Sequence, residues 1–437
     1  MVSLNSEPID SQVSSNKITS YLLHRSTKDS ISGTNPNTET NINTDGDSFL
    51  NISSKCCKST DKSFKLEHQL NQEDSVEVRG IVRKENRSIG GYELGVTEIK
   101  VINHVTSDFP ISPKEHGADF LMSHRHLWLR SKKQNAIMRV RHQIVKAIRD
   151  FFDNNDFTLI DSPIFTGNAV EGTTTLFEVD YFERSAYLTQ SGQLYQEAAA
   201  TAFGKTYCFG PTFRAEKSKT RRHLTEFWMV EPEMAFVDLD ENMTWAENLV
   251  GYIIQQVIEN CFTELKTLDR DIAKLESISP PFPRITYDEA SKILKENGSE
   301  FKYGNDFGAS DETILSAQFD KPVMIHRWPA NIKPFYMKRD EHKNELALGI
   351  DMIAPEGYGE IVGGGQREDN IDVLTNSIRH HDLPLEPFQW FLDLRKYGSV
   401  PHSGFGLGLE RVVAWICGTK HIRETIPFPR TMARLDP

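Results

Sequence analysis

Apolar and polar residues alternate along two neighbouring segments, residues 75–82 and 92–102, with Gly90 and Gly91 between them. A period of two places successive side chains on opposite faces of a strand, and a glycine-containing turn can join two antiparallel strands. The pattern therefore predicts a β-hairpin. Because a two-stranded hairpin alone is marginally stable, we expect it to pack on further structure.

A helical period begins at Ser131, which can cap the first turn. Apolar residues recur after it at helical spacing, at Ile137, Val140, Ile144, Ile148 and Phe151. Residues 157–162 then predict a short strand that ends at Pro163, since proline cannot donate a hydrogen bond within a sheet. The sequence thus predicts a helix–strand–proline unit.

Farther along the chain, strand and helix patterns are mixed rather than regularly alternating. Segments 206–209, 226–230 and 233–236 predict strands, and 242–265 predicts a helix. There is no Gly-x-Gly-x-x-Gly sequence and no repeated β-α-β rhythm. These patterns favour an α+β fold, with an antiparallel sheet flanked by helices, over a parallel nucleotide-binding sheet.

The first 60 residues differ in composition from the rest. They contain 27 serine, threonine and asparagine residues and only two aromatic ones, Tyr21 and Phe49. Such a segment buries too little apolar surface to offset the entropy lost on ordering. We therefore expect a low-complexity, largely disordered segment at 1–70, a small β domain at 71–112 and a large α+β domain at 113–437.

The net charge and the spacing of the cysteines argue against several classes of protein. The net charge of −12 argues against indiscriminate nucleic-acid binding, although Lys217, Lys219, Arg221 and Arg222 form a local basic cluster. The five cysteines include no Cys-x-x-Cys pair, so zinc sites and disulfides are not expected. With neither a membrane-spanning apolar stretch nor a secretory signal in view, the cytoplasm is the expected compartment.

Two motifs carry the candidate chemistry. The segment 213–216 reads Phe-Arg-Ala-Glu and is followed by His223-Leu-Thr-Glu-Phe227, and 404–411 reads Gly-Phe-Gly-Leu-Gly-Leu-Glu-Arg. In this order they resemble motifs 2 and 3 of the class II aminoacyl-tRNA synthetases, and the helix–strand–proline unit resembles motif 1. The resemblance implies a class II antiparallel sheet, ATP as a substrate and a homodimer formed through the motif 1 region.

Adenylate formation needs an in-line attack on the α-phosphorus, so catalysis consists of positioning and fixed positive charge. The resemblance gives the catalytic roles to Arg214, which holds the α-phosphate and the substrate carboxylate, and to Arg411, which lies over adenine and reaches the γ-phosphate. It gives the other ATP-binding roles to Glu216 at the adenine amino group, Phe227 at the second adenine face, and Arg222 and His223 at the outer phosphates.

The segment 349–367 indicates which subgroup of the class II synthetases this chain resembles. Asp351 and Glu360 form an acid pair that could hold Mg²⁺ through oxygen ligands, with Glu360 also contacting ATP. Gly363 leaves space for the substrate, and Arg367 points at its side chain. The string Glu360-Ile-Val-Gly-Gly-Gly-Gln-Arg367 resembles the subgroup that activates aspartate, asparagine and lysine.

A second segment distinguishes asparagine from aspartate. The family's aspartate enzymes carry a lysine where this chain has Gln196, within Gln193-Leu-Tyr-Gln-Glu197. A second carboxylate at Glu197 would repel aspartate but accept a hydrogen bond from a carboxamide, to whose oxygen Arg367 can donate. The resemblance adds Glu171 as the ligand of the α-ammonium group, and Gln193 completes the amino-acid site.

The resemblance to asparaginyl-tRNA synthetases runs from Ser75 to Arg430. It implies an asparagine–tRNA ligase that uses ATP, L-asparagine and tRNA(Asn). It departs at the front, where only the last two strands of an anticodon-binding OB domain are recognisable, so 71–112 is expected to be a partial OB fold. Two alternatives stay open, a tRNA-independent asparagine synthetase and a catalytically silent regulatory paralogue.

Overall fold

The computed structural model describes residues 70–86, 92–168, 170, 175–218 and 220–436, and only the backbone at 21–22, 24–25, 42–43 and 50–53. The chain divides into two compact units, Met1–Lys132 and Lys133–Pro437. This division falls later in the chain than the expected boundary at residue 112, because the short helices α2 (Ala118–Ser123) and α3 (Arg125–Trp128) belong to the first unit.

The first unit contains the predicted hairpin. β5 (Ser75–Lys84) and β6 (Tyr92–Asn103) pair antiparallel, with Val78 opposite Ile99, so this prediction is confirmed. The alternation in the sequence corresponds to one buried face, made by Val76, Val78, Leu94 and Val96. The predicted glycine turn at Gly90 and Gly91 lies outside the described residues.

The hairpin belongs to a six-stranded sheet of order β1-β5-β6-β4-β3-β2. The four additional strands are β1 (Tyr21–Leu22), β2 (His24–Arg25), β3 (Ile42–Asn43) and β4 (Leu50–Ser53). The structure differs here from the sequence prediction of two strands after a disordered segment. Strands of two to four residues are too short to show the alternation on which the prediction depends. The other positions of 1–69 lie outside the described residues.

The second unit contains an eight-stranded sheet of order β13-β14-β15-β16-β17-β12-β11-β7. Its pairs are antiparallel except β7 with β11 and β13 with β14. The strands span β7 (Thr158–Leu159), β11 (Lys205–Phe213), β12 (Glu226–Ala235), β13 (Arg284–Thr286), β14 (Val323–Pro329), β15 (Leu346–Ala354), β16 (Gly359–Gln366) and β17 (His402–Gly408). The predicted α+β class is confirmed. The two strands predicted at 226–236 form one, since Pro232 stays in register opposite Tyr207.

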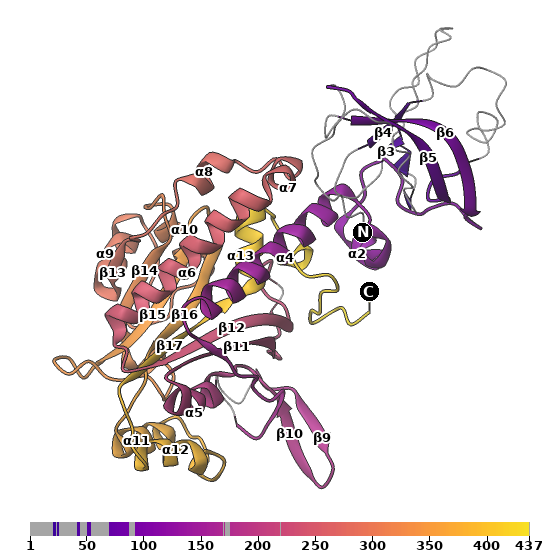
Figure 1. Ribbon diagram of the computed structural model, residues 1–437. Helices are drawn as coiled ribbons and strands as arrows, with labels where there is room; N and C mark the ends of the chain where they lie inside the picture. The colour runs from indigo at the N-terminus through magenta and orange to yellow at the C-terminus, as the bar shows by residue number, and fades with distance from the viewer. Residues whose placement is uncertain are drawn as a thin grey trace. The chain divides into compact units, whose positions relative to one another are not determined.

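One helical layer covers a face of this sheet (Figure 1). It consists of α4 (Lys132–Asp153), α6 (Leu239–Asn260) and α13 (Leu409–Cys417). Their apolar stripes form the main core with the strands, including the fully buried Ile144, Ile253 and Val413. The helix predicted at 242–265 starts earlier, at the Asp238 cap, and ends at Asn260, before the short α7 (Phe262–Thr267).

On the opposite side of the sheet in Figure 1 lie α5 (Gln193–Phe203), α11 (Ile371–His380) and α12 (Gln389–Lys396). They share a second core that includes Leu194, Leu374 and Phe391. A hairpin of β9 (Glu178–Tyr181) and β10 (Arg184–Leu188) extends from this side and pairs with β8 (Phe165–Thr166).

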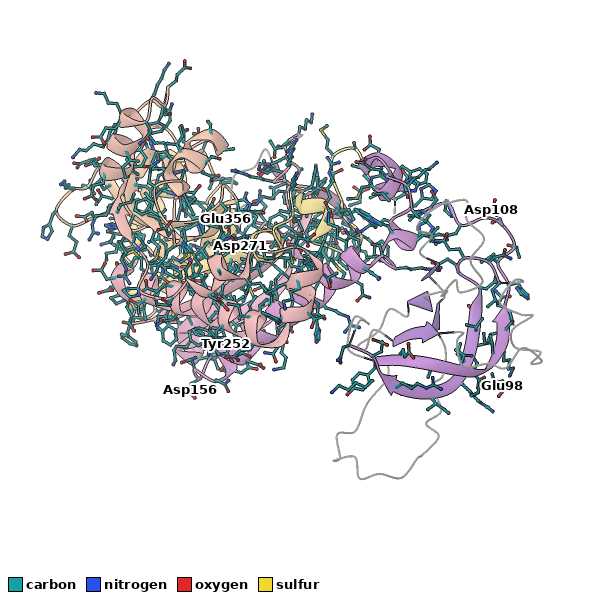
Figure 2. All side chains as sticks on the ribbon, turned by 90° about the horizontal axis from the view of Figure 1, so that it is seen from above. Glu98, Asp108, Asp156, Tyr252, Asp271 and Glu356 are labelled. Carbon is teal, nitrogen blue, oxygen red and sulfur yellow. The ribbon has the colours of Figure 1, made fainter. Side chains whose placement is uncertain are left out.

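The described residues also form the helices α8 (Ile272–Glu276), α9 (Tyr287–Glu296) and α10 (Ala309–Ser316), and the 3-10 helices η3 (Ala330–Ile332), η4 (Glu386–Phe388) and η5 (Ile422–Glu424). The turn from β15 to β16 is fixed by Glu356, which accepts two hydrogen bonds from Arg270 at 2.9 and 2.5 Å; Figure 2 labels Glu356 beside Asp271. Within the described part of the chain, no helix has both the length and the apolar character needed to cross a membrane.

Candidate active site

A cavity of about 700 Å³ lies in the second unit, between strands β12, β15, β16 and β17 and the loops around them. Most residues predicted for the site line it: Gln193, Arg214, Glu216, Arg222, His223, Phe227, Asp351, Glu360, Gly363, Arg367 and Arg411. Of the other two, Glu171 lies outside the described residues and Glu197 does not line the cavity. The fold thus gathers residues spread over more than half of the chain.

The β11–β12 hairpin brings Arg214 and Phe227 together. Phe213 pairs with Glu226 at the end of the ladder, and the Arg214 amide donates to the Thr225 carbonyl at 3.0 Å. The Arg214 guanidinium therefore lies over the Phe227 ring, 5.4 Å from its centroid. A cation and an aromatic face are presented side by side to the cavity.

The loop after Arg214 adds a cluster of titratable groups. His223 Nε2 lies 3.6 Å from Glu216 Oε2. Burial, together with the charges of Arg411, Arg214 and Arg222, lowers the pKa of His223, although Glu216 opposes this shift. The imidazole is therefore neutral near pH 7.

Arg222 and Arg411 are each held by groups of neighbouring elements. Arg222 Nη1 donates to Glu312 Oε2 of α10 at 2.7 Å, and Nη2 donates to the Gly357 carbonyl. Arg411 is in the first turn of α13 and donates to the Glu360 carbonyl at 2.6 Å. Both cations are thereby fixed next to the β15–β16 strands that carry the predicted acids.

Asp351 and Glu360 converge above Gly363. A Cβ atom placed on Gly363 would lie 2.6 Å from Glu360 Oε1 and 3.7 Å from Asp351 Oδ1, so the two carboxylates face the same small space. Burial raises the pKa of Asp351 to about 7; the charge and hydrogen bond of Lys333 oppose this shift, and the charge of Glu360 adds to it. Two carboxylates that face one space are the oxygen ligands that a divalent cation prefers.

Lys333 was not predicted from the sequence. Its Nζ lies 2.6 Å from Asp351 Oδ2 and 3.9 Å from the centroid of the Trp328 ring, and the side chain lines the cavity. Lys333 stands in a loop after β14 without a recognisable motif, so only the fold places it opposite Asp351.

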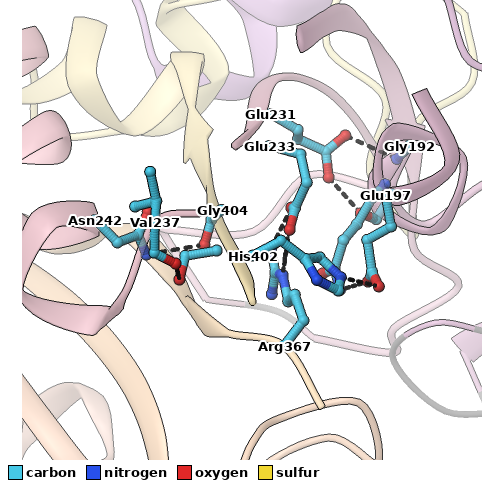
Figure 3. Close-up of polar contacts among 12 residues, drawn as sticks. Gly192, Glu197, Glu231, Glu233, Val237, Asn242, Arg367, His402 and Gly404 are labelled. Carbon is cyan, nitrogen blue, oxygen red and sulfur yellow. Dashed lines mark hydrogen bonds and ion pairs between the residues drawn. The ribbon is translucent and has the colours of Figure 1, made fainter. Parts of the chain in front are cut away.

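Arg367 is almost fully buried and is anchored on one side only. Its Nε donates to Glu233 Oε1 at 3.0 Å and its Nη2 to Glu233 Oε2 at 2.9 Å (Figure 3). Among the described residues, Nη1 has no hydrogen-bond partner. Because Arg367 lines the cavity, this geometry leaves one donor group for a ligand.

Glu231 and Glu233 are the clearest residues that the sequence prediction missed. Glu231 lines the cavity, and its carboxylate accepts from the Ser191 hydroxyl and, at 2.8 Å, from the Gly192 amide before α5 (Figure 3). Both acids are buried in the middle of β12. Their position in the sequence could have marked both acids as functional candidates. A carboxylate that is buried in a core strand needs either a charged partner or a function.

The position of Glu197 differs from the expectation that it contacts the substrate. Its carboxylate is fully buried and accepts from Arg395 Nη2 at 2.5 Å, His402 Nε2 at 2.9 Å and Gln193 Nε2 at 3.0 Å. Gln196 also turns away, donating to the Ile160 carbonyl at 2.7 Å. Only Gln193 of this segment reaches the cavity, because the first turn of α5 places Glu197 one turn farther along the helix.

Comparison with known proteins identifies the family. The model of the tRNA synthetases class II (D, K and N) matches residues 117–432. This chain belongs to the class II tRNA synthetases. The matched span of the synthetase includes every described residue of the cavity.

Several relatives of this class II synthetase match over most of their length. An asparagine–tRNA ligase of Sorangium cellulosum is 58% identical over 389 residues, covering 86% of this chain and 87% of the relative. One of Desulforamulus reducens is 58% identical over 380 residues, covering 87% and 88%.

Solved structures agree with these relatives. The asparaginyl-tRNA synthetase of Pyrococcus horikoshii complexed with asparaginyl-adenylate is similar with a TM-score of 0.86 and 43% identity, over 91% of this chain and 92% of that one. That of Entamoeba histolytica in complex with asparaginyl-adenylate has a TM-score of 0.83 and 31% identity, over 92% and 93%.

Proposed function

We propose that this chain is an asparagine–tRNA ligase, which activates asparagine with ATP to asparaginyl-adenylate and transfers it to the 3′-terminal adenosine of tRNA(Asn). One observation carries the proposal: a single cavity combines fixed cations, an aromatic face, an acid pair and a half-anchored arginine. The identities of 55–58% to asparagine–tRNA ligases support the same reaction. A tRNA-independent synthetase and a silent paralogue are less well supported.

The activation step needs little proton transfer. The asparagine carboxylate attacks the α-phosphorus of ATP, and pyrophosphate leaves on the opposite side. Arg214 would hold the α-phosphate and the carboxylate, and Arg411, Arg222 and the neutral His223 would hold the outer phosphates. Such preorganised donors stabilise the transition state more than the ground state.

Phe227 would stack on adenine, and Glu216 would accept a hydrogen bond from its amino group. Both line the cavity beside Arg214. ATP would thus be bound by one aromatic ring, one carboxylate and several arginines. A small-molecule pocket is expected to combine apolar surface with a few polar groups in this way.

The acid pair fits Mg²⁺, since two carboxylates face one space and Gly363 keeps that space open. Asp351 and Glu360 would hold the ion, which when bound neutralises the charge on the phosphates. Arg411 and Lys333, which contact Glu360 and Asp351 respectively, would keep the two strands in place around it.

The amino-acid end of the cavity is the end with Arg367. Its unpartnered Nη1 would donate to the carboxamide oxygen of asparagine. Glu231, Gln193 and the backbone at Gly363 line the same cavity and would surround the rest of the amino acid. Glu171, the residue after Val170 in the sequence, would bind the α-ammonium group.

We also infer a homodimer formed through the motif 1 region. Directly after Pro163, Ile164 and Phe165 are 43% and 50% exposed, and Phe182 at the β9–β10 turn is 93% exposed. Large apolar side chains grouped in this way mark an interaction surface. We expect sedimentation of the purified chain to give a dimer and a Phe165→Asp variant to shift toward monomer; an unchanged dimer would place the interface elsewhere.

The acceptor end of the tRNA would bind near the basic residues Lys217, Arg221 and Arg222, and its anticodon would bind the first unit. The ligase would act in the cytoplasm. Phosphate contacts of basic side chains make such binding sensitive to salt.

The proposed function is tested by ATP–pyrophosphate exchange with a panel of amino acids. We expect exchange that depends on asparagine and Mg²⁺, with aspartate and lysine at least tenfold slower in kcat/KM. Equal exchange with aspartate would contradict the assignment to asparagine, and no exchange with any amino acid would favour the silent paralogue.

A further inference from the structure

Five buried charged side chains lie close together behind the cavity in two adjoining ion-paired groups, Arg367 with Glu233 and Glu197 with Arg395 and His402, which together are called the network below. Only Arg367 among them lines the cavity. The network joins α5, β12, α12, β17 and the end of β16, and Figure 3 shows Arg367, Glu233, His402 and Glu197 close together.

The network is not a metal site, although Glu197, Glu233 and His402 offer ligand atoms within 4.8 Å of one another. Both carboxylates are already paired with guanidinium groups, Glu233 with Arg367 and Glu197 with Arg395. The cations of the network are therefore side chains of this chain.

His402 carries a positive charge in this arrangement. Its Nδ1 faces the Val400 carbonyl at 2.8 Å and its Nε2 faces Glu197 Oε2 at 2.9 Å. Both partners are acceptors, so both ring nitrogens must donate, which only the imidazolium form can do. Burial lowers the pKa of His402, but the hydrogen bond and charge of Glu197, together with the charge of Glu233, raise it above the usual value for histidine.

Glu197 acts on the cavity through two side chains. Gln193, one helical turn before it on α5, donates Nε2 to Glu197 Oε1 at 3.0 Å. Because a carboxylate can only accept, this bond fixes which end of the Gln193 amide turns away from Glu197. The charge of Glu197, added to that of Glu233, also offsets the positive charge of Arg367.

We propose that Glu197 is a positioning residue that makes the cavity select a carboxamide over a carboxylate. Glu197 does so in two ways: it offsets the positive charge of Arg395 and His402, which are buried behind Arg367, and it orients Gln193. With Glu197 ionised, three cations face two carboxylates, and a substrate carboxylate gains little from the single excess charge. Without it, Arg395 and His402 are left uncompensated, and the excess positive charge attracts a carboxylate. This inference rests on the proposed asparagine-activating function.

The test is Glu197→Gln, which keeps the shape of the side chain and removes its charge. Pyrophosphate exchange with asparagine and with aspartate is measured on the full chain. We expect the ratio of kcat/KM for asparagine to that for aspartate to fall about tenfold or more, from the loss of one charge at this depth. An unchanged ratio in a folded E197Q variant would overturn the inference.

The pH dependence separates an electrostatic role from a structural one. In E197Q the charge of His402, which also faces Glu233 and Arg395, is no longer held by a carboxylate. We therefore expect aspartate exchange in E197Q to rise as pH falls from 8 to 6, while the unmodified chain keeps a constant ratio. If the ratio of kcat/KM for asparagine to that for aspartate does not depend on pH in E197Q, the charge of Glu197 is not what sets the selectivity.

Two further variants complete the design. Glu247→Gln removes another buried carboxylate, which pairs with Arg284 at 2.9 Å outside the cavity, and should leave the ratio unchanged. Adding His402→Gln to E197Q removes the excess cation and should restore at least part of the selectivity. If the unmodified chain shows no asparagine-dependent exchange, the proposed function fails; if it selects asparagine and E197Q does so equally, only the inference about Glu197 fails.

Discussion

Replacing Arg214 with alanine is expected to lower asparagine-dependent pyrophosphate exchange by a factor on the order of 10² to 10³, as for the loss of one fixed oxyanion donor. Arg214 follows β11 directly and is held over Phe227 at the cavity wall. In the proposed reaction it contacts both the attacking carboxylate and the α-phosphate, so its loss affects the transition state more than substrate binding. The effect should therefore appear in kcat as well as in kcat/KM.

Two variants control this measurement. Arg214→Lys keeps the charge but loses the planar fork of donors, and should recover only a small part of the activity. Arg79→Ala removes an arginine that is exposed in the first unit and pairs with Glu98, and should exchange at the unmodified rate. An R214A variant that exchanges as fast as the unmodified chain would show that the phosphate site lies elsewhere.

Replacing Glu360 with glutamine should lower maximal exchange by about two orders of magnitude or more and raise the Mg²⁺ concentration needed for half-maximal rate. Glu360 and Asp351 face one space above Gly363, and the amide is a much weaker ligand than the carboxylate. A Mg²⁺ titration of the exchange rate measures both effects.

Glu356→Gln is the matched control. Glu356 lies in the turn between the same two strands but binds Arg270, outside the cavity. It should leave the Mg²⁺ dependence unchanged and affect stability only. If E360Q and E356Q have the same Mg²⁺ requirement, the acid pair does not hold the ion.

The sequence alone predicted those elements and site residues that depend on a local pattern, either a hydrophobic period or a short motif. The hairpin at Ser75–Asn103 and the helix after Ser131 follow from periodicity, and Arg214, Glu360 and Arg411 follow from motifs. Arg214 directly follows a strand, Glu360 is on a strand and Arg411 is at a helix start, so their placement depends mainly on local structure. The class II synthetase family, expected from the motifs, is confirmed.

The sequence was uninformative where position depends on packing between distant segments. The role given to Glu197 assumed that its neighbourhood in the sequence put it beside the substrate, whereas the helical turn of α5 directs it to Arg395 and His402, about two hundred residues away. Lys333, in the loop after β14, meets Asp351 of β15, and Glu233 of β12 meets Arg367 at the end of β16, only because the fold brings these segments together. Such contacts have no signature within a single stretch of sequence.

Charging of bulk tRNA with radiolabelled amino acids is the decisive experiment for the proposed ligase activity, because it requires the adenylate site and tRNA recognition together. We expect asparagine to be attached to tRNA(Asn), and aspartate and lysine not to be attached at a comparable rate. Asparagine-dependent exchange without any charging would contradict the ligase activity and favour a tRNA-independent enzyme, and charging with aspartate as fast as with asparagine would contradict the assigned amino acid.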